Sequence, residues 1–249
     1  MALPLLTKEV MDGDCGYRYF QSAVRIRHGM DDIGGVDPQT VNKIVIERKK
    51  SEEGVWLKIR EVNIITSDDI VFTLHDYTAL SRQSYDYRSV CISEAGETQG
   101  VVVSITPITQ GIVIADRSKA YVSLFNCKYT HQRVFSFAQI TPYYSRYPHT
   151  VQNGEMNYES GSVEGLFNPL GIGCDIQMEY GDYEKKMIDF LSNGEPKMIT
   201  TFDGRGWYAA LKSPVSCSSE AGSGLVGVKL EWTETGDMPA DINILTAGW

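Results

Sequence analysis

Apolar and polar positions alternate in short runs along most of the first hundred residues. In the run 22–29, for example, Val24 and Ile26 share one parity, and Arg25 and Arg27 share the other. A period of two is typical of a strand that buries one face. The same criterion predicts seven strands, at residues 16–20, 22–29, 42–50, 55–62, 69–77, 85–92 and 101–107.

The segments between these strands are rich in Gly, Asp and Ser, which favour turns. Seven short antiparallel strands at this spacing predict a β-sandwich over residues 1–107. Tyr85 begins the sixth strand, after a turn led by Leu80. In such sandwiches a tyrosine at this corner buries its ring and returns its hydroxyl to the backbone a few residues upstream. We therefore predict that Tyr85 is a structural corner residue.

Residues 108–249 combine further strand patterns with one helix pattern. Two strand-like runs lie in 111–129, and a long strand is expected in 225–236. The segment 197–212 is predicted to be a hairpin, with Asp203 and Gly204 in its turn. The predicted fold class is therefore all-β, mainly β with one helix, in two domains at 1–107 and 108–249.

The helix is expected near residues 182–193. Asp182 is a plausible N-cap, and Gly194 follows the expected end. The apolar positions recur at the spacing i, i+4, i+7 and i+8, which forms one stripe on a helix. They are Tyr183, Met187, Phe190 and Leu191.

An aromatic stretch at 130–173 is interrupted by three prolines. It is too apolar for a disordered linker and too irregular for a long helix, so it predicts short strands joined by extended loops. Consecutive tyrosines within 139–162 cannot all face one core, because successive strand side chains point apart. Exposed aromatic residues are typical of interaction surfaces. We therefore assign a subunit interface to Tyr143, Tyr144, Tyr147 and Tyr158.

Two other interpretations of the aromatic residues between 135 and 167 remain open. They could stack on sugars, as tyrosine-rich loops of binding modules do, or they could form ordinary core of the second domain. Alternating positions such as Val134 to Phe137 fit a core best.

Composition narrows the classes of partner. The formal net charge is −9, which disfavours specific nucleic-acid binding and anionic membranes. No apolar run approaches the ~20 residues that a membrane-spanning helix needs. The beginning of the chain also lacks the pattern of a secretory signal, so we expect synthesis in a cytoplasm and no membrane insertion. The five cysteines are scattered and odd in number, as expected for free thiols.

Candidate chemical motifs are weak. The segment 222–227, "GSGLVG", has the spacing of a nucleotide-binding loop but lacks the strand before it and the helix after it. Glu231 and Glu234 lie in a predicted strand and would point to opposite faces, which disfavours a glycosidase pair. The four histidines have no metal-ligand spacing. We expect no catalytic residue, no metal and no cofactor.

Several motifs support two family resemblances. Residues 15–107 resemble the fibronectin type III family in the "IER" strand, the Trp56 strand, the "DYT" turn and the "YDYR" strand. Residues 111–249 carry "YPHTVQNG", "FLSNGEPK", "DGRGW" and "EWTETGD". This second half is similar to distal tail and minor tail proteins of bacteriophage tail tips and baseplates.

The second resemblance implies a tail-protein β-sandwich domain and a structural virion protein, made in the host cytoplasm, that forms a homo-oligomeric ring. It implies contacts with other tail proteins, such as the tail tube, tape measure, hub or receptor-binding proteins. No catalytic residue carries over from it. Two alternatives remain: a carbohydrate- or receptor-binding module of the tail, and a cell-wall-degrading tail enzyme.

Overall fold

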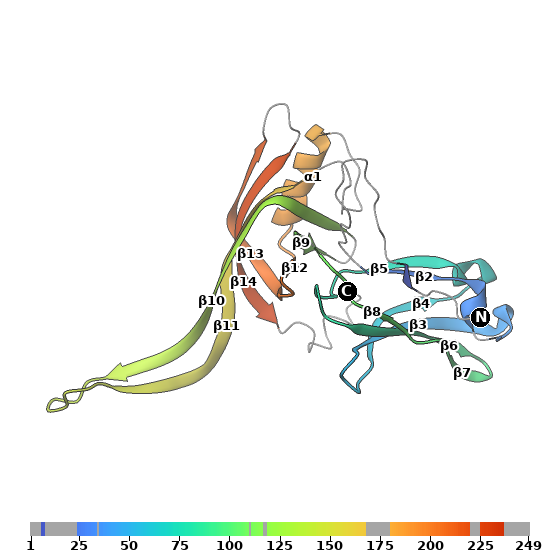
Figure 1. Ribbon diagram of the computed structural model, residues 1–249, viewed down its shortest axis with the longest axis horizontal. Helices are drawn as coiled ribbons and strands as arrows, with labels where there is room; N and C mark the ends of the chain where they lie inside the picture. The colour runs from blue at the N-terminus through green and yellow to red at the C-terminus, as the bar shows by residue number, and fades with distance from the viewer. Residues whose placement is uncertain are drawn as a thin grey trace.

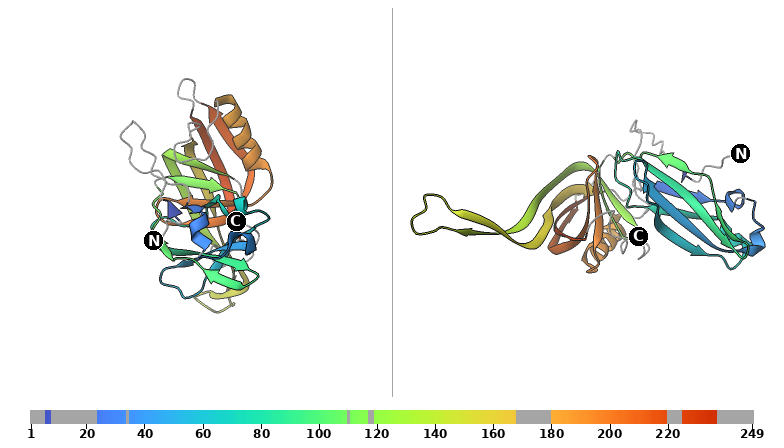
Figure 2. Two further views of the ribbon diagram at one scale, coloured as in Figure 1. Left: turned by 90° about the vertical axis from the view of Figure 1, so that its right-hand side faces the viewer. Right: turned by 90° about the horizontal axis from the view of Figure 1, so that it is seen from below.

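The computed structural model describes residues 6–7, 24–33, 35–109, 111–116, 119–167, 180–219 and 225–236. In this part of the chain, regular structure consists of strands, one α-helix and three short 3-10 helices, which confirms the all-β prediction. The molecule is elongated, with a two-sheet domain at one end and a long hairpin at the other (Figures 1 and 2). A β-barrel lies between them.

The N-terminal domain has two antiparallel sheets that share one core. One sheet has the order β1 (Leu6–Thr7), β2 (Val24–His28), β5 (Phe72–Asp76). The other has the order β4 (Leu57–Asn63), β3 (Val41–Lys50), β6 (Tyr85–Ser93), β7 (Gly96–Gln99), and β8 (Val103–Ile105) also pairs with β6. The short 3-10 helices span Met30–Ile33, Pro38–Thr40 and Ser67–Ile70.

The strands predicted at 42–50 and 85–92 correspond to β3 and β6, because their period-two pattern follows the buried face. The strand predicted at 16–20 lies outside the described residues. One prediction is wrong: the loop expected between the last two strands contains β7, which pairs with β6 through a turn at Gly96. The backbone φ of Gly96 is 126°, a value that favours glycine.

The Tyr85 side chain lies in the core of this domain. It is 1% exposed, and its hydroxyl accepts a hydrogen bond of 3.1 Å from the backbone N–H of Leu80. The guanidinium of Arg48 lies 4.7 Å from the centre of the Tyr85 ring. The ring and its hydroxyl therefore fix the turn that leads into β6.

A buried ion pair joins the two sheets. Arg48 of β3 donates to Asp76 of β5 at 2.6 Å, and both side chains are almost completely buried. The Tyr87 hydroxyl donates to the same carboxylate at 2.7 Å, and the Thr78 hydroxyl donates to its second oxygen at 2.6 Å. Burial alone would raise the pKa of Asp76, but the charge of Arg48 and these hydrogen bonds hold that pKa below its usual value. Asp76 is therefore an anion in the folded protein.

His28 is a second buried ionisable group of this domain. His28 is 2% exposed, its Nδ1 lies 2.9 Å from the carbonyl oxygen of Ile70, and its ring stacks on Phe72. Burial lowers the pKa of His28 below 6.5, against the opposing effects of Ile70 and the nearby Asp32. At a pH just below 6.5, the His28 ring therefore stays neutral in the folded protein, whereas it takes up a proton in the unfolded chain.

We expect the free energy of unfolding to fall as the pH drops below about 6.5, because protons then bind the unfolded chain preferentially. Above that pH the contribution of His28 is fully present. Urea unfolding at about pH 7.5 and pH 5 measures the effect. The His28→Gln variant should lose part of the pH dependence, whereas His149→Gln, at an exposed position, should keep all of it. Equal pH dependence in both variants would contradict the assignment.

The second domain is a closed barrel rather than the two open sheets of the expected sandwich. Its strand order is β10 (Ala120–Ile140), β11 (His149–Phe167), β14 (Val226–Gly236), β13 (Gly206–Ser219), β12 (Lys197–Thr201), β9 (Ile112–Ala115), and β9 returns to β10. The predicted hairpin is β12 and β13, and the predicted final strand is β14. The barrel closes because β9 pairs with both β10 and β12.

The helix α1 (Tyr180–Ser192) packs against the barrel core. It begins two residues before the expected start, so Asp182 lies in its first turn rather than at the N-cap. Gly194 follows its end with a φ of 78°. The predicted apolar stripe is buried together with barrel residues that include Tyr121, Val163, Phe167, Trp207 and Trp232.

A glycine in β11 is required by close packing. A Cβ atom at Gly161 would lie 1.8 Å from the backbone oxygen of Thr130 and 2.9 Å from the Trp232 ring. Backbone cannot move aside as a flexible side chain can, so Gly161→Ala is expected to destabilise the barrel by roughly 1–3 kcal/mol. Gly54→Ala is the matched control, because nothing lies within 4 Å of a Cβ atom there. Equal melting temperatures for the two variants would contradict this account.

The two domains contact each other through a small apolar cluster. Tyr77 of the N-terminal domain is buried against Val113, Val122 and Met198 on the barrel. A Cβ atom at Gly204 would lie 2.6 Å from the backbone oxygen of Ser81, so the turn between β12 and β13 also lies close to the N-terminal domain. The hairpin points away from this junction (Figure 1).

Candidate functional site

The strands β10 and β11 extend well beyond the barrel. β10 pairs with β9 only from Ala120 to Ser123, and β11 pairs with β14 only from Ser160 to Phe167. Beyond these pairs, β10 and β11 bond to each other (Figures 1 and 2). We call residues 133–158 the arm.

The prediction of short strands joined by extended loops for 130–173 is therefore wrong where the structure describes that stretch. In the arm, β10 and β11 bond to each other along their inner edges, and neither face of the hairpin contributes to a core cluster of the described residues. Without a buried face, the sequence has no reason to alternate. Residues 168–173 lie outside the described part of the chain.

A large bulge bends the arm. Between Phe135 and Phe137, β10 advances two residues, whereas β11 advances five, from Asn157 to Gln152. Extra residues on one strand of a pair curve that strand and increase its twist. The distal part of the arm is accordingly turned away from the direction of the barrel strands (Figure 1).

Three of the four predicted interface tyrosines lie together at the tip of the arm. Tyr143, Tyr144 and Tyr147 are 89%, 95% and 69% exposed, which is incompatible with a core position in the isolated chain. Tyr143 and Tyr144 contact each other edge to face, with ring centres 4.7 Å apart. Tyr158 is separate: it is half-buried at the base of the arm, opposite Val134.

Further exposed apolar side chains extend along the arm from the tyrosines at its tip towards the barrel. The charged residues of the arm are Arg133, Arg146 and Glu155, in a chain whose net charge is −9. An apolar, weakly charged projection of this length is unusual on a protein surface. Its other exposed apolar side chains are Phe135, Phe137, Ile140, Val151 and Met156.

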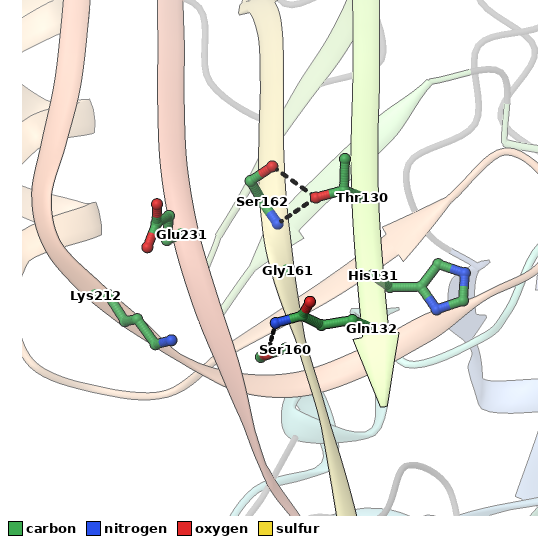
Figure 3. Close-up of a pocket in the computed structure, with 8 residues that line it drawn as sticks. All are labelled: Thr130, His131, Gln132, Ser160, Gly161, Ser162, Lys212 and Glu231. Carbon is green, nitrogen blue, oxygen red and sulfur yellow. Dashed lines mark hydrogen bonds between the residues drawn. The ribbon is translucent and has the colours of Figure 1, made fainter. Parts of the chain in front are cut away.

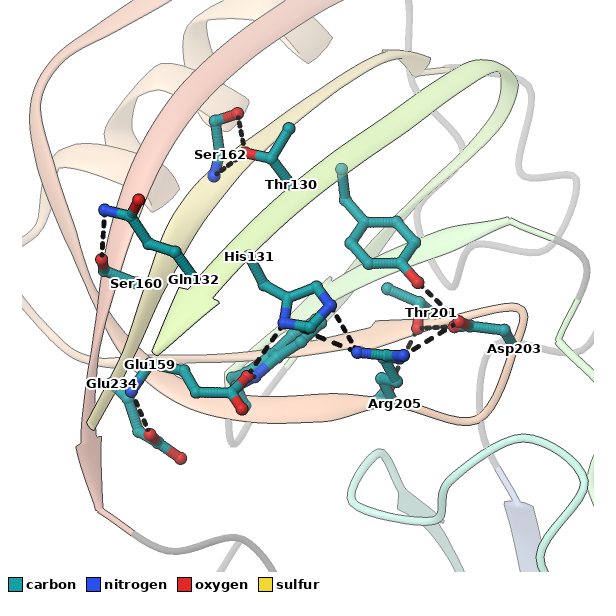
Figure 4. A network of polar contacts seen from close by, with 12 residues as sticks. Thr130, His131, Gln132, Glu159, Ser160, Ser162, Thr201, Asp203, Arg205 and Glu234 are labelled. Carbon is teal, nitrogen blue, oxygen red and sulfur yellow. Dashed lines mark hydrogen bonds and ion pairs between the residues drawn. The ribbon is translucent and has the colours of Figure 1, made fainter. Parts of the chain in front are cut away.

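A group of polar contacts surrounds the point at which the arm leaves the barrel (Figure 4). We call it the arm-root network. It consists of Tyr129, His131, Glu159, Thr201, Asp203, Arg205, Trp207 and Glu234. The sequence motifs "DGRGW" and "EWTETGD" contain part of this network, but no pattern predicts that its members meet, because they come from four segments that are far apart along the chain.

The carboxylate of Glu159 accepts a hydrogen bond of 2.7 Å from Trp207 Nε1, and it lies 3.4 Å from His131 Nδ1. The guanidinium of Arg205 contacts the other nitrogen of His131. The backbone N–H of Glu159 donates to the carboxylate of Glu234 at 2.7 Å. Both strands of the arm are thus bonded to β13 or β14, or to the turn before β13.

Asp203 completes the network on the β10 side. It accepts hydrogen bonds of 2.5 Å from the hydroxyls of Tyr129 and Thr201, and it lies 3.4 Å from Arg205. Burial would raise the pKa of Asp203, but the hydrogen bonds from Thr201 and Tyr129 hold it below its usual value. Beneath these contacts, Tyr129 and His131 lie against Trp207, which packs on Trp232 with ring centres 4.7 Å apart.

A polar pocket of about 250 Å³ lies beside the arm root (Figure 3). Thr130 and Ser162 bond to each other through their hydroxyls at 2.8 Å, and His131 is turned towards Arg205 and Glu159 instead of a hydroxyl. Among its described residues, the pocket therefore contains no hydroxyl activated by a histidine. It is lined by Thr130, His131, Gln132, Ser160, Gly161, Ser162, Lys212 and Glu231.

The other sequence candidates are not brought together as a reactive site. Glu231 is exposed and pairs in register with Ser162 and Lys212, whereas Glu234 bonds to the backbone of Glu159. No group of acidic, histidine or cysteine residues suited to a metal occurs in the described ranges. Residues 222–224 of the glycine-rich motif lie outside those ranges.

The thiols found in the structure are unpaired. Cys91, Cys127 and Cys217 are free cysteines, and burial raises the pKa of Cys91 to about 11. Cys15 and Cys174 lie outside the described residues. Among the helices that the structure describes, none combines the length and apolar content needed to cross a membrane.

Comparison with known proteins does not assign this chain to a family. No protein-family model matches it, and no curated protein is significantly similar to it in sequence.

Proposed function

We propose that this protein is a structural component of a bacteriophage tail or tail-like particle, in which copies assemble into a ring at the tail tip or baseplate. The observation that carries the proposal is the arm, with its apolar surface and exposed tyrosine tip. A lone subunit leaves this surface in water, whereas a neighbouring copy would cover it. The tail-protein resemblance of residues 111–249 specifies the kind of particle.

The backbone of the arm supports assembly as well. Among the described strands, β10 pairs only with β11 beyond Ser123, and β11 pairs only with β10 before Ser160. The arm therefore has two outer strand edges, whose N–H and C=O groups can pair with another chain. Because the two edges differ, a contact between the β10 edge of one copy and the β11 edge of the next is heterologous. Repeated contacts of this kind close into a ring when the rotation between copies divides a full turn, and otherwise give an open filament; we propose the ring.

The proposed role needs no chemistry at the contact. The arm supplies shape, apolar area and hydrogen-bonding edges, and we assign no catalytic residue, metal or cofactor to the protein. Its partners are copies of itself and adjoining tail proteins, such as the tail tube, tape measure, hub or receptor-binding proteins. Its acidic charge disfavours a stable complex with DNA.

Ring formation by the purified protein tests the proposal. Sedimentation velocity over a range of concentrations, followed by electron microscopy of the largest species, should show one discrete closed oligomer. A variant in which residues 136–156 are replaced by a two-residue Asn-Gly turn should remain monomeric. Its circular dichroism should still show folded β-structure, because the removed residues lie outside the barrel. A full-length protein that stays monomeric at every concentration would contradict the proposal.

Carbohydrate binding is the second candidate, because the tip tyrosines are exposed enough to stack on sugars. Titration with cell-wall glycans, followed by tyrosine and tryptophan fluorescence, separates the two functions. Saturable quenching that disappears in Tyr144→Ser, together with a protein that remains monomeric, would favour the carbohydrate-binding function.

A further inference from the structure

We infer that the arm-root network fixes the direction of the arm before assembly, with Glu159 as its central positioning residue. The inference rests on the proposed function and deepens it: the contact surface would be presented ready-made rather than ordered by the neighbouring copy.

On the β11 side, the network continues the sheet where the strand ladder ends. The last registered pair of β11 with β14 joins Ser160 to Thr233. At the next residue towards the arm, the Glu234 side chain replaces the backbone as hydrogen-bond partner. Its carboxylate accepts a hydrogen bond of 2.7 Å from the backbone N–H of Glu159. This bond holds Glu159, the first residue of β11 outside the barrel, in line with residues 160–167 of the same strand, which pair with β14.

On the β10 side, two side chains are held by the turn between β12 and β13. The Tyr129 hydroxyl donates to Asp203, and Arg205 contacts His131. Asp203 is itself fixed by the Thr201 hydroxyl and by Arg205. Among the strands that the structure describes, only β11 lies beside β10 at these positions, so the turn takes the place of a second neighbouring strand.

Glu159 couples the two sides. Its carboxylate accepts a hydrogen bond from Trp207 Nε1 and lies beside His131, while its backbone N–H donates to the carboxylate of Glu234 (Figure 4). It stands opposite Arg133, the first residue of the arm on β10. One residue therefore contacts β10, β13 and β14 where a bend of the hairpin would have to begin. Hydrogen bonds to a charged carboxylate are stronger than neutral ones, which suits them to this role.

A fixed arm lowers the cost of association. A hairpin that swings about its root must lose that freedom when it binds, and the loss weakens the contact. A preset direction also presents the same geometry in every copy, which a closed ring requires. We expect Glu159→Ala to leave the barrel folded, to widen the range of arm directions and to raise the concentration needed for half-assembly by about tenfold.

Single-molecule energy transfer measures the arm direction directly. Dyes are attached through unnatural amino acids at position 144 on the tip and position 229 on the barrel, which leaves the native cysteines in place. At monomer concentrations, the full chain should give a narrow distance distribution, and Glu159→Ala a broad one. Glu159→Gln keeps an oxygen that can accept the Trp207 bond and should restore most of the narrow distribution. Glu155→Ala is the matched control, an exposed glutamate on the same strand that lies outside the arm-root network.

Identical distributions for the unsubstituted chain and Glu159→Ala would overturn the inference, and so would a broad distribution for the unsubstituted chain. A general loss of stability would widen the distribution in Glu159→Gln as well, and would also lower the melting temperature. The proposed function is judged separately, by assembly of the unlabelled chain. Rings that form normally in Glu159→Ala with an unchanged distribution would remove the positioning role and leave the ring intact. An unsubstituted chain that forms no rings, but whose distance distribution is narrow and broadens in Glu159→Ala, would contradict the proposed function and support the positioning role of Glu159.

Discussion

Replacing Tyr143 and Tyr144 together with serine is expected to abolish ring formation while both domains remain folded. The two side chains are 89% and 95% exposed, so the isolated chain loses almost no packing when they are shortened. In an assembled contact, buried tyrosines often act as hot spots that contribute roughly 2 kcal/mol or more each. Loss of both would weaken each contact by about three orders of magnitude. Sedimentation velocity and thermal melting measure the two parts of this prediction.

The matched control is the pair Val101→Ser and Val102→Ser in the N-terminal domain. These side chains are also apolar and about half exposed, but they lie away from the arm. The control should form rings at the concentration of the unsubstituted protein. Normal rings from the tyrosine variant would show that the tip lies outside the contact. Hydrogen exchange gives an independent check, because the outward-facing backbone amides of residues 139–158, which β10 and β11 do not use to bond to each other, should gain protection on assembly.

Asp76→Ala is expected to cause the largest loss of stability in the N-terminal domain, about 3–5 kcal/mol. The substitution leaves Arg48 charged, buried and without its carboxylate partner, and it also removes the acceptor of the Tyr87 and Thr78 hydroxyls. An unpaired buried charge costs more than the pair contributes, because water no longer solvates it. Such a loss is a large fraction of the total stability of a typical domain, about 5–15 kcal/mol. Urea unfolding measures it.

Two comparisons isolate the buried charge. Asp68→Ala removes an exposed aspartate from the same domain and should change the free energy of unfolding by less than about 0.5 kcal/mol. The double variant Arg48→Met with Asp76→Leu removes both charges, and it should recover part of the loss, because neither charge is left alone. If Asp76→Ala were no less stable than Asp68→Ala, the ion pair would have no structural importance.

The sequence predicted local structure well wherever a strand or helix buries one face. β3 and β6 follow the alternation of their apolar residues, and the apolar stripe of α1 packs on the barrel as expected. The sequence predicts the start of α1 two residues too late, because Asp182 resembles an N-cap equally well inside the first turn. This error concerns a boundary and does not change the element.

The sequence predicts short strands and loops where the arm has two long strands, and the reason is physical. Its residues are exposed or at most half-buried on both faces, so no fully buried side imposes a period on Phe135, Phe137 or Ile140. The apolar excess with an irregular pattern predicts an interaction surface; the structure shows that Tyr143 and Tyr144 are exposed at the tip, and the interface itself stays a prediction. The sequence also does not predict that the second domain closes into a barrel, because closure depends on β9 pairing with both β10 and β12.

The buried ion pair and the arm-root network could not be found from the sequence at all. Arg48 and Asp76 are 28 residues apart and lie in different sheets, and Glu159 and Trp207 are 48 residues apart. Each residue type is ordinary for a strand end or a surface. Only the fold, which brings four segments to the mouth of the barrel, turns Glu159 into a central residue.

The continuity of β10 and β11 also determines how the molecule would carry mechanical load. Tension on the tip of the arm runs along both strands into the barrel, where it reaches four registered pairs with β9 and eight with β14. Hydrogen bonds in an antiparallel ladder lie perpendicular to the strands, so this pull shears all of them at once instead of opening them one after another. A neighbour that grips the arm would therefore pull on the whole barrel as a single rigid body.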